Sequence, residues 1–122
     1  MLQGPRSIIY GVKDVAAARD WYSKALGFPP YFDQPFYVGF SVGGYELGLY
    51  PGVKFAAAKS EGVVAYWGVD DVPAEVARLV ALGATLHDPV HDVGEGIVMA
   101  TVLDPFGNLI GLIYNPHFKA DA

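Results

Sequence analysis

The chain contains no cysteine, which excludes disulfide bonds, thiolate nucleophiles, cysteine-ligated zinc sites and iron–sulfur clusters. Any metal site would therefore have to be built from His, Asp or Glu side chains. A cluster of basic residues is also lacking, since 8 Lys and Arg stand against 13 Asp and Glu for a net charge of −5. Because nothing in this pattern could neutralise a run of phosphates, we expect no nucleic-acid partner.

Long apolar runs are absent as well. No run approaches the roughly 20 residues of a membrane-spanning helix, and the N-terminal MLQGPR lacks the apolar region of a secretory signal. We therefore expect a soluble, cytoplasmic protein with no membrane partner. The 122 residues, 52% of them hydrophobic, are enough to bury a substantial core, so we expect one domain over residues 1–122.

The first half of the chain predicts a strand, a helix and two further strands. Residues 7–12 are apolar and β-branched, and Asp14 is placed to cap a helix that ends at Gly27. An apolar stripe recurs at helical spacing between those two caps; its members are Val15, Ala18, Tyr22 and Leu26. Residues 37–42 and 45–50 then predict two strands joined by a Gly-Gly turn.

The second half repeats this order. Residues 63–69 predict a strand, Asp71 is a second N-cap, and Gly83 ends a second apolar stripe at helical spacing. Further strands are expected over 84–86, 97–103 and 109–114. The intervening residues 54–62 show little apolar periodicity and are expected to link the two halves.

The sequence DPFG at residues 104–107 predicts a tight turn before the last strand. Asp104 can hydrogen-bond the turn backbone, Pro105 pre-sets φ, and Gly107 tolerates the exit geometry. The strand behind this turn is an apolar run whose middle inward position is Gly111. Which residues occupy the inward positions of this strand matters for function.

Short motifs recur in the same order in both halves, which indicates an internal repeat. VKDV at 12–15 matches VDDV at 69–72, ALGF at 25–28 matches ALGA at 81–84, and GLY at 48–50 resembles GLI at 111–113. The economical interpretation is two tandem βαβββ units, about residues 6–53 and 63–116, in an α+β fold.

This arrangement resembles the vicinal oxygen chelate superfamily, which includes glyoxalase I, extradiol dioxygenases, fosfomycin-resistance enzymes and bleomycin-resistance proteins. The motifs that support the resemblance are the early VKD and ALGF and the late DPFGN. The resemblance implies that the strands curl into a cup that holds the ligand, with the helices outside. It also implies that metal-dependent members place His, Gln or Glu at inward positions on the first and last strand of each unit.

The positions that the resemblance assigns to metal ligands hold almost no ligand side chains in this chain. They correspond to Ser7, Val64, Gly48 and Gly111, or to Glu46 in place of Gly48 if that strand is shifted by two residues. At most one of the four sites supplies a strong oxygen ligand, whereas protein sites normally supply at least three. We therefore expect no metal and no other cofactor.

Ligand-binding candidates come from strand parity with these positions, from the dense aromatic cluster between Tyr31 and Phe40, which could line a pocket, and from one face of the strand over 97–103. They are Tyr66, Glu46, Phe36, Phe40, Gly48, Gly111, Thr101 and Met99. Glu46 would orient a polar ligand group or act as a base, unless it is simply a solvated residue of an edge strand or the partner of a nearby Tyr or Lys. Tyr66 is either a pocket residue or a strand former, and the two glycines either permit close packing or leave room for an organic ligand.

Four polar residues near one another, His87, His91, Asp92 and Glu95, invite a metal interpretation. We expect His87 on a strand and the other three in a glycine-containing loop, so we assign them to the polar mouth of the cup.

The predicted function is metal-independent binding of a small, partly aromatic or apolar molecule in the cup, with antibiotic sequestration of the bleomycin-resistance type as one form. Its basis is the surplus of aromatic residues and the shortage of metal ligands. The alternative is an enzyme, either a glyoxalase-like lyase or isomerase or a dioxygenase with an unidentified metal site. A metal-free enzyme that uses Glu46 for proton transfer is a third possibility. The resemblance and the repeat also imply a homodimer.

Overall fold

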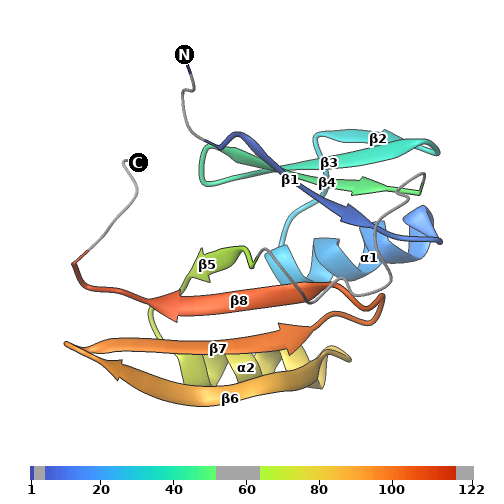
Figure 1. Ribbon diagram of the computed structural model, residues 1–122. Helices are drawn as coiled ribbons and strands as arrows, with labels where there is room; N and C mark the ends of the chain where they lie inside the picture. The colour runs from blue at the N-terminus through green and yellow to red at the C-terminus, as the bar shows by residue number, and fades with distance from the viewer. Residues whose placement is uncertain (2–4, 52–63, 118–122) are drawn as a thin grey trace. The chain divides into compact units, whose positions relative to one another are not determined.

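The computed structural model describes residues 1, 5–51 and 64–117, and the chain divides into two compact units, Met1–Ala56 and Ala57–Asp121. In its described residues, each unit contains one helix and one four-stranded sheet in the order βαβββ (Figure 1). The α+β class and the tandem repeat are thereby confirmed. The predicted linker 54–62 lies outside the described residues, and a single domain over 1–122 stays a prediction.

In unit 1, α1 (Val15–Leu26) packs on one face of a sheet with strand order β1-β4-β3-β2 (Figure 1). The strands are β1 (Ser7–Gly11), β2 (Phe32–Gln34), β3 (Tyr37–Val42) and β4 (Tyr45–Tyr50). β1 runs parallel to β4, and the other neighbours are antiparallel. The core consists of buried Tyr10, Val12, Val15, Ala18, Tyr22, Val38, Phe40, Leu47 and Leu49.

The ends of α1 are set by local chemistry, as the sequence predicts. The Asp14 side chain accepts a hydrogen bond from the backbone N–H of Ala17 at 3.0 Å, which satisfies one of the free donors of the first turn. Gly27 ends the helix at φ 86°, and its N–H donates to the Ser23 carbonyl at 2.9 Å.

Unit 2 repeats this architecture with strand order β5-β8-β7-β6 and α2 (Val72–Ala81) packed on the sheet (Figure 1). The strands are β5 (Tyr66–Gly68), β6 (Thr85–Gly94), β7 (Ile97–Leu103) and β8 (Leu109–Tyr114). Its helix-side core consists of Val72, Leu79, Ala84, Ala100, Val102, Ile110 and Leu112. Among residues 5–51 and 64–117, neither helix is long and apolar enough to cross a membrane.

The predicted turn before β8 forms through Asp104, which is buried. Its Oδ1 accepts hydrogen bonds from the backbone N–H of Phe106 at 2.9 Å and of Asn108 at 2.8 Å. Gly107 has φ 86°, a conformation in which a side chain would be strained. Asp104 therefore fixes the hairpin that joins β7 to β8.

Three strands differ from the sequence prediction. β2 is not predicted, because all three of its residues are exposed and show no apolar alternation. β5 covers only residues 66–68 of the expected strand over 63–69, of which residue 63 lies outside the described residues. β6 is much longer than the expected 84–86, and the prediction misses most of it because its ten residues are all exposed and Pro89 interrupts the pattern.

Candidate functional site

The open face of the unit 1 sheet lies opposite α1 and presents polar and aromatic side chains. Strand alternation places Glu46 and Gly48 on this face, while Leu47 between them is buried against the helix. Ser7 of β1 and Ser41 of β3 pair with Glu46 on either side. We call this surface the Glu46 face. Its members in the paired strands are Ser7, Ile9, Phe32, Tyr37, Gly39, Glu46, Gly48 and Tyr50. Tyr31 and Phe36 join it through contacts with Glu46 and with Phe32.

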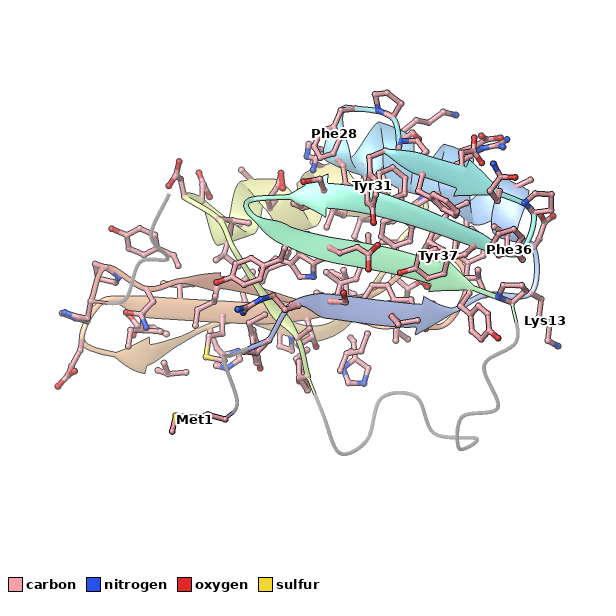
Figure 2. All side chains as sticks on the ribbon, turned by 90° about the horizontal axis from the view of Figure 1, so that it is seen from above. Met1, Lys13, Phe28, Tyr31, Phe36 and Tyr37 are labelled. Atoms are coloured by element: carbon pink, nitrogen blue, oxygen red, sulfur yellow. The ribbon has the colours of Figure 1, made fainter. Side chains whose placement is uncertain are left out.

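Three hydroxyl groups converge on the Glu46 carboxylate. Ser7 Oγ donates to Oε1 at 2.9 Å, and the Tyr37 hydroxyl donates to the same oxygen at 2.8 Å. The Tyr31 hydroxyl donates to Oε2. Figure 2 shows Tyr31 and Tyr37 on the same side of the sheet, over β3 and β4. The donors come from three separate segments of unit 1, so the carboxylate is fixed by the fold of the whole unit.

These hydrogen bonds keep the carboxylate charged. The bond from Tyr31 is the main cause that lowers the pKa of Glu46, and the bonds from Tyr37 and Ser7 act in the same direction against partial burial. At neutral pH the group is therefore an anion that accepts three O–H donors.

The pKa values of Tyr31 and Tyr37 change in the opposite direction to that of Glu46. Burial, together with the hydrogen bond to Glu46 and its charge, raises the pKa of Tyr37 to about 12. The hydrogen bond to Glu46 raises the pKa of Tyr31 as well. Both hydroxyls are therefore neutral donors at any physiological pH, and neither is a useful acid or base.

A series of aromatic rings in contact with one another lies beside the Glu46 carboxylate. The Phe32 ring lies 6.5 Å from Tyr31, 6.0 Å from Phe36 and 6.1 Å from Tyr37, measured between centroids, and Tyr37 lies 6.5 Å from Tyr50. Tyr31 is 64% exposed and Phe36 is 61% exposed. Exposed apolar surface gathered in one place typically marks a binding site.

Glycines let the tyrosine rings lie close to the sheet. A Cβ at Gly48 would stand 2.1 Å from the Tyr37 hydroxyl oxygen, and one at Gly39 would stand 2.8 Å from Glu46 Oε2 and 3.0 Å from the Tyr31 ring. The room that we expected over Gly48 for a ligand is therefore filled by Tyr37. Gly48 serves the site indirectly, because it allows Tyr37 to reach Glu46.

Glu46 has no cationic partner among the described residues. Within residues 5–51 and 64–117, Arg19 pairs with Asp20 and Asp33, Arg78 pairs with Glu75, and His87 Nδ1 lies 3.8 Å from Asp88 Oδ2. The hydrogen bonds that the described residues make to the Glu46 side chain come from neutral hydroxyls.

The open face of unit 2 holds four of the other predicted site residues. Tyr66, 41% exposed, lies over Gly111, where a Cβ would stand 2.6 Å from its ring and 2.8 Å from the Ala65 carbonyl oxygen. Thr101 is buried; its Oγ1 accepts the backbone N–H of Asp88 at 3.0 Å and lies 2.9 Å from His87 Nδ1. Met99 is partly buried and pairs with Ile113 of β8.

The eight predicted site residues are thus distributed over three places. Glu46, Phe36 and Gly48 lie on the Glu46 face, and Tyr66, Gly111, Thr101 and Met99 lie on the open face of unit 2. Phe40 is fully buried and packs against Phe28. Alternation along β3 turns Phe40 to the helix side, so its ring belongs to the core.

Two hydroxyl donors, Tyr37 and Tyr31, belong to the aromatic cluster that could line a pocket, but neither is among the eight predicted site residues. Tyr37 could have been found from its strand parity with Gly39, which faces Gly48. Tyr31 offers no such signal, because it precedes β2, a strand that the sequence does not predict.

The described residues do not fit a metal ion of the kind that the family resemblance implies. Ser7, Val64, Gly48 and Gly111 supply one hydroxyl and no imidazole or carboxylate, and that hydroxyl already donates to Glu46. In residues 5–51 and 64–117 no three His, Asp or Glu side chains come together as ligands.

The histidines near the β6–β7 hairpin also differ from expectation. His91 and Asp92 lie in β6 rather than in a loop, and only Glu95 lies in the turn. The ring of His91 contacts the Pro89 carbonyl oxygen at 2.8 Å, and His87 contacts Thr101. These side chains have separate partners, and nothing in their arrangement resembles a shared site.

Comparison with known proteins gives one family and many similar folds. A family model described as the glyoxalase/bleomycin resistance protein/dioxygenase superfamily matches residues 5–112. No curated protein sequence gives a significant match.

Similar solved structures cover nearly the whole chain. A glyoxalase-related enzyme from Fulvimarina pelagi is 24% identical with a TM-score of 0.81, and the match covers 99% of this chain and 94% of that one. A lactoylglutathione lyase from Agrobacterium tumefaciens is 20% identical with a TM-score of 0.73, over 98% and 100% of the two chains. At these identities the likeness shows a shared fold.

Proposed function

The chain belongs to the glyoxalase/bleomycin resistance protein/dioxygenase superfamily, and from that premise we propose that it binds a small, partly aromatic or apolar molecule without a metal ion. The observation that supports this proposal most directly is the Glu46 face, where a charged carboxylate is held in place among exposed aromatic rings. The carboxylate would orient the ligand and the rings would supply contact area. Sequestration of an antibiotic, as in bleomycin-resistance proteins, is one form of this activity.

The energetics of such a site favour a flat ligand. A favourable aromatic stack contributes about 0.5–1.5 kcal/mol beyond the burial of area. The exposed rings of Tyr31 and Phe36 offer such surfaces without any change of fold. The carboxylate needs little reorganisation to meet a ligand, because three hydroxyls already hold it.

Proton transfer by Glu46 is a poor alternative. A general base works best with a pKa near the working pH, whereas hydrogen bonds from Tyr31, Tyr37 and Ser7 lower the pKa of this carboxyl. The geometry therefore favours a fixed anion over a base.

A second candidate function is a lyase or isomerase reaction. It is favoured by the likeness to the structure described as a lactoylglutathione lyase. Elemental analysis of untagged protein separates the candidates, because stoichiometric zinc, nickel, manganese or iron would support the enzyme and overturn metal-independent binding.

The direct test is a calorimetric screen of the metal-free chain against small aromatic and apolar molecules. We expect saturable binding that weakens in Tyr31→Ala and persists in Tyr114→Ala, a matched exposed tyrosine at the end of β8. Turnover of a substrate without any such binding would overturn the proposal.

We also propose that the chain forms a homodimer, as its family resemblance implies. Light scattering at micromolar concentration should give twice the chain mass of 13.1 kDa. A single-chain mass would contradict this.

A further inference from the structure

We propose that the Glu46 face selects ligands that carry a cationic nitrogen, such as an ammonium or amidinium group, beside an aromatic or apolar body. This inference rests on the binding function proposed above and adds the charge of the ligand to it. Four observations support it: an uncompensated charge, the direction of the hydroxyl donors, the surrounding rings and the net charge of the chain.

The first observation is the uncompensated charge of Glu46. No Lys, Arg or His among residues 5–51 and 64–117 forms an ion pair with it. Arg6 is a basic residue just before β1, and its backbone carbonyl accepts the N–H of Glu46. Its guanidinium donates to the Pro5 carbonyl at 3.3 Å. Arg19 forms an ion pair with Asp33. Asp33 pairs across β2 and β3 with Val38, which is buried on the helix side of the sheet, so this ion pair lies on the face opposite Glu46. A ligand cation would thus meet a negative charge that no basic side chain in the described part of the chain pairs with.

The second observation is the direction of the hydroxyl donors. The Ser7, Tyr31 and Tyr37 hydroxyls all donate to Glu46, so none of these protons is available to a ligand. A carboxylate has about four acceptor positions, and Tyr31 is the one donor to Oε2 within residues 5–51 and 64–117, so a second acceptor position on Oε2 has no donor from these residues. The site can therefore accept an N–H, but it offers an anionic ligand only repulsion.

The third observation is the ring chemistry around the charge. Aromatic faces carry negative quadrupole charge and attract cations that approach within about 6 Å of the centroid. The Tyr31 and Tyr37 rings lie beside the carboxylate that they donate to, and Phe32 lies 6.5 Å and 6.1 Å from them. Neutral aromatic ligands gain only the stacking, whereas a cation also gains from the carboxylate and the ring faces.

The fourth observation is the net charge of −5 on the chain. A negative field attracts cations to the surface before contact and repels anions. This contribution is not specific to Glu46, so salt will weaken it. The selectivity of the Glu46 face itself must therefore be measured by changing Glu46.

The test uses three probes with the same aromatic body: phenethylammonium, 2-phenylethanol and phenylacetate. Each is titrated into the ¹⁵N-labelled 122-residue chain and followed by amide chemical shifts. We expect phenethylammonium to bind about tenfold more tightly than 2-phenylethanol, phenylacetate to bind most weakly, and the shifts to map to β1, β3 and β4.

The decisive variant is Glu46→Gln, which keeps the size of the side chain and removes its charge. We expect the cation preference to fall to about onefold to twofold, while 2-phenylethanol still binds. Tyr37→Phe, which keeps the charge and the ring, should retain the preference. Glu75→Gln is the matched control, because Glu75 lies in α2 and pairs with Arg78.

The outcomes separate this inference from the proposed function. Equal binding of the cation and the neutral probe overturns the charge selectivity and leaves small-molecule binding intact. Binding of none of the three probes overturns the selectivity, and the calorimetric screen then decides on the proposed function. A cation preference that survives Glu46→Gln, or a Glu46 face found covered by a second copy of the chain, also overturns it.

Discussion

The two units use the same strand arrangement to present different open faces. Gly48 and Gly111 occupy equivalent positions, because each pairs with the first strand of its unit, at Ile9 and at Tyr66. Two residues before the glycine, unit 1 has the charged Glu46 and unit 2 has Leu109, which is only 6% exposed. One repeat therefore carries a polar site where the other carries a buried apolar residue.

In both units a tyrosine ring packs against the equivalent glycine, but the tyrosine comes from a different strand. A tyrosine covers each glycine, but Tyr37 comes from β3 in unit 1 and Tyr66 comes from β5 in unit 2. Tyr37 donates to a carboxylate, while Tyr66 is held by its ring contact with Gly111. The glycine is therefore a structural feature of the repeat. The hydroxyl cage, which we define as the Ser7, Tyr31 and Tyr37 hydroxyls around the Glu46 carboxylate, belongs to unit 1.

The largest expected effect comes from adding a methyl group at either glycine. In Gly111→Ala the Cβ would meet the Ala65 backbone oxygen at 2.8 Å and the Tyr66 ring at 2.6 Å, so the backbone itself must shift. We expect a loss of about 3 kcal/mol in the free energy of unfolding. In Gly48→Ala the obstacle is the Tyr37 hydroxyl group at 2.1 Å, a side chain that can move, so we expect about 1–2 kcal/mol.

Urea denaturation measures both variants. Gly68→Ala is the control, because no atom lies within 4 Å of a Cβ built there, and it should change stability by less than about 0.5 kcal/mol. Gly48→Ala should also lower ligand affinity through the loss of the Tyr37 hydrogen bond. Equal losses at Gly48 and Gly111 would contradict the distinction between a side-chain obstacle and a backbone obstacle.

A smaller change in the free energy of unfolding is expected when the hydroxyl is removed from Tyr37, and a smaller one still for Tyr66. Tyr37→Phe removes a hydroxyl that donates to the charged Glu46 at 2.8 Å, so we expect a loss of about 1 kcal/mol in the free energy of unfolding. The value is modest because the carboxylate is partly exposed to water. Tyr66→Phe removes no hydroxyl contact of this kind and should change stability by less than about 0.5 kcal/mol. Thermal or urea unfolding of the pair checks this, and a larger loss at Tyr66 would reverse the comparison.

The repeat could be predicted from sequence because its signals are local. The caps Asp14 and Asp71, the glycines after the helices and the DPFG turn act within a few residues, and all of them form as expected. The equivalence of Gly48 and Gly111 followed from short motifs that recur in order.

The contents of the site could be predicted only in part. Glu46 was identified because the family resemblance points to the last strand of unit 1 and strand alternation puts Glu46 on the same face as Gly48. The sequence shows that a glycine lacks a side chain but not which ring fills the space, since that depends on pairing between β3 and β4. Tyr31 is the clearest case, because it reaches Glu46 from outside any predicted strand.

The smallest expected effect is the acid response of the unit 1 carboxylate. Hydrogen bonds from Tyr31, Tyr37 and Ser7 lower the pKa of Glu46 in the folded chain below its ordinary 4.5. The folded state therefore gains stability from Glu46 above pH 4.5, and this gain disappears as the pH falls through the lowered folded value. We expect the stability difference between the native chain and Glu46→Gln to shrink below pH 4.5, as measured by urea unfolding. Leu109→Val is the control: because Leu109 cannot titrate, its stability difference from the native chain should not change with pH. A stability difference for Glu46→Gln that is likewise independent of pH would contradict the hydroxyl cage.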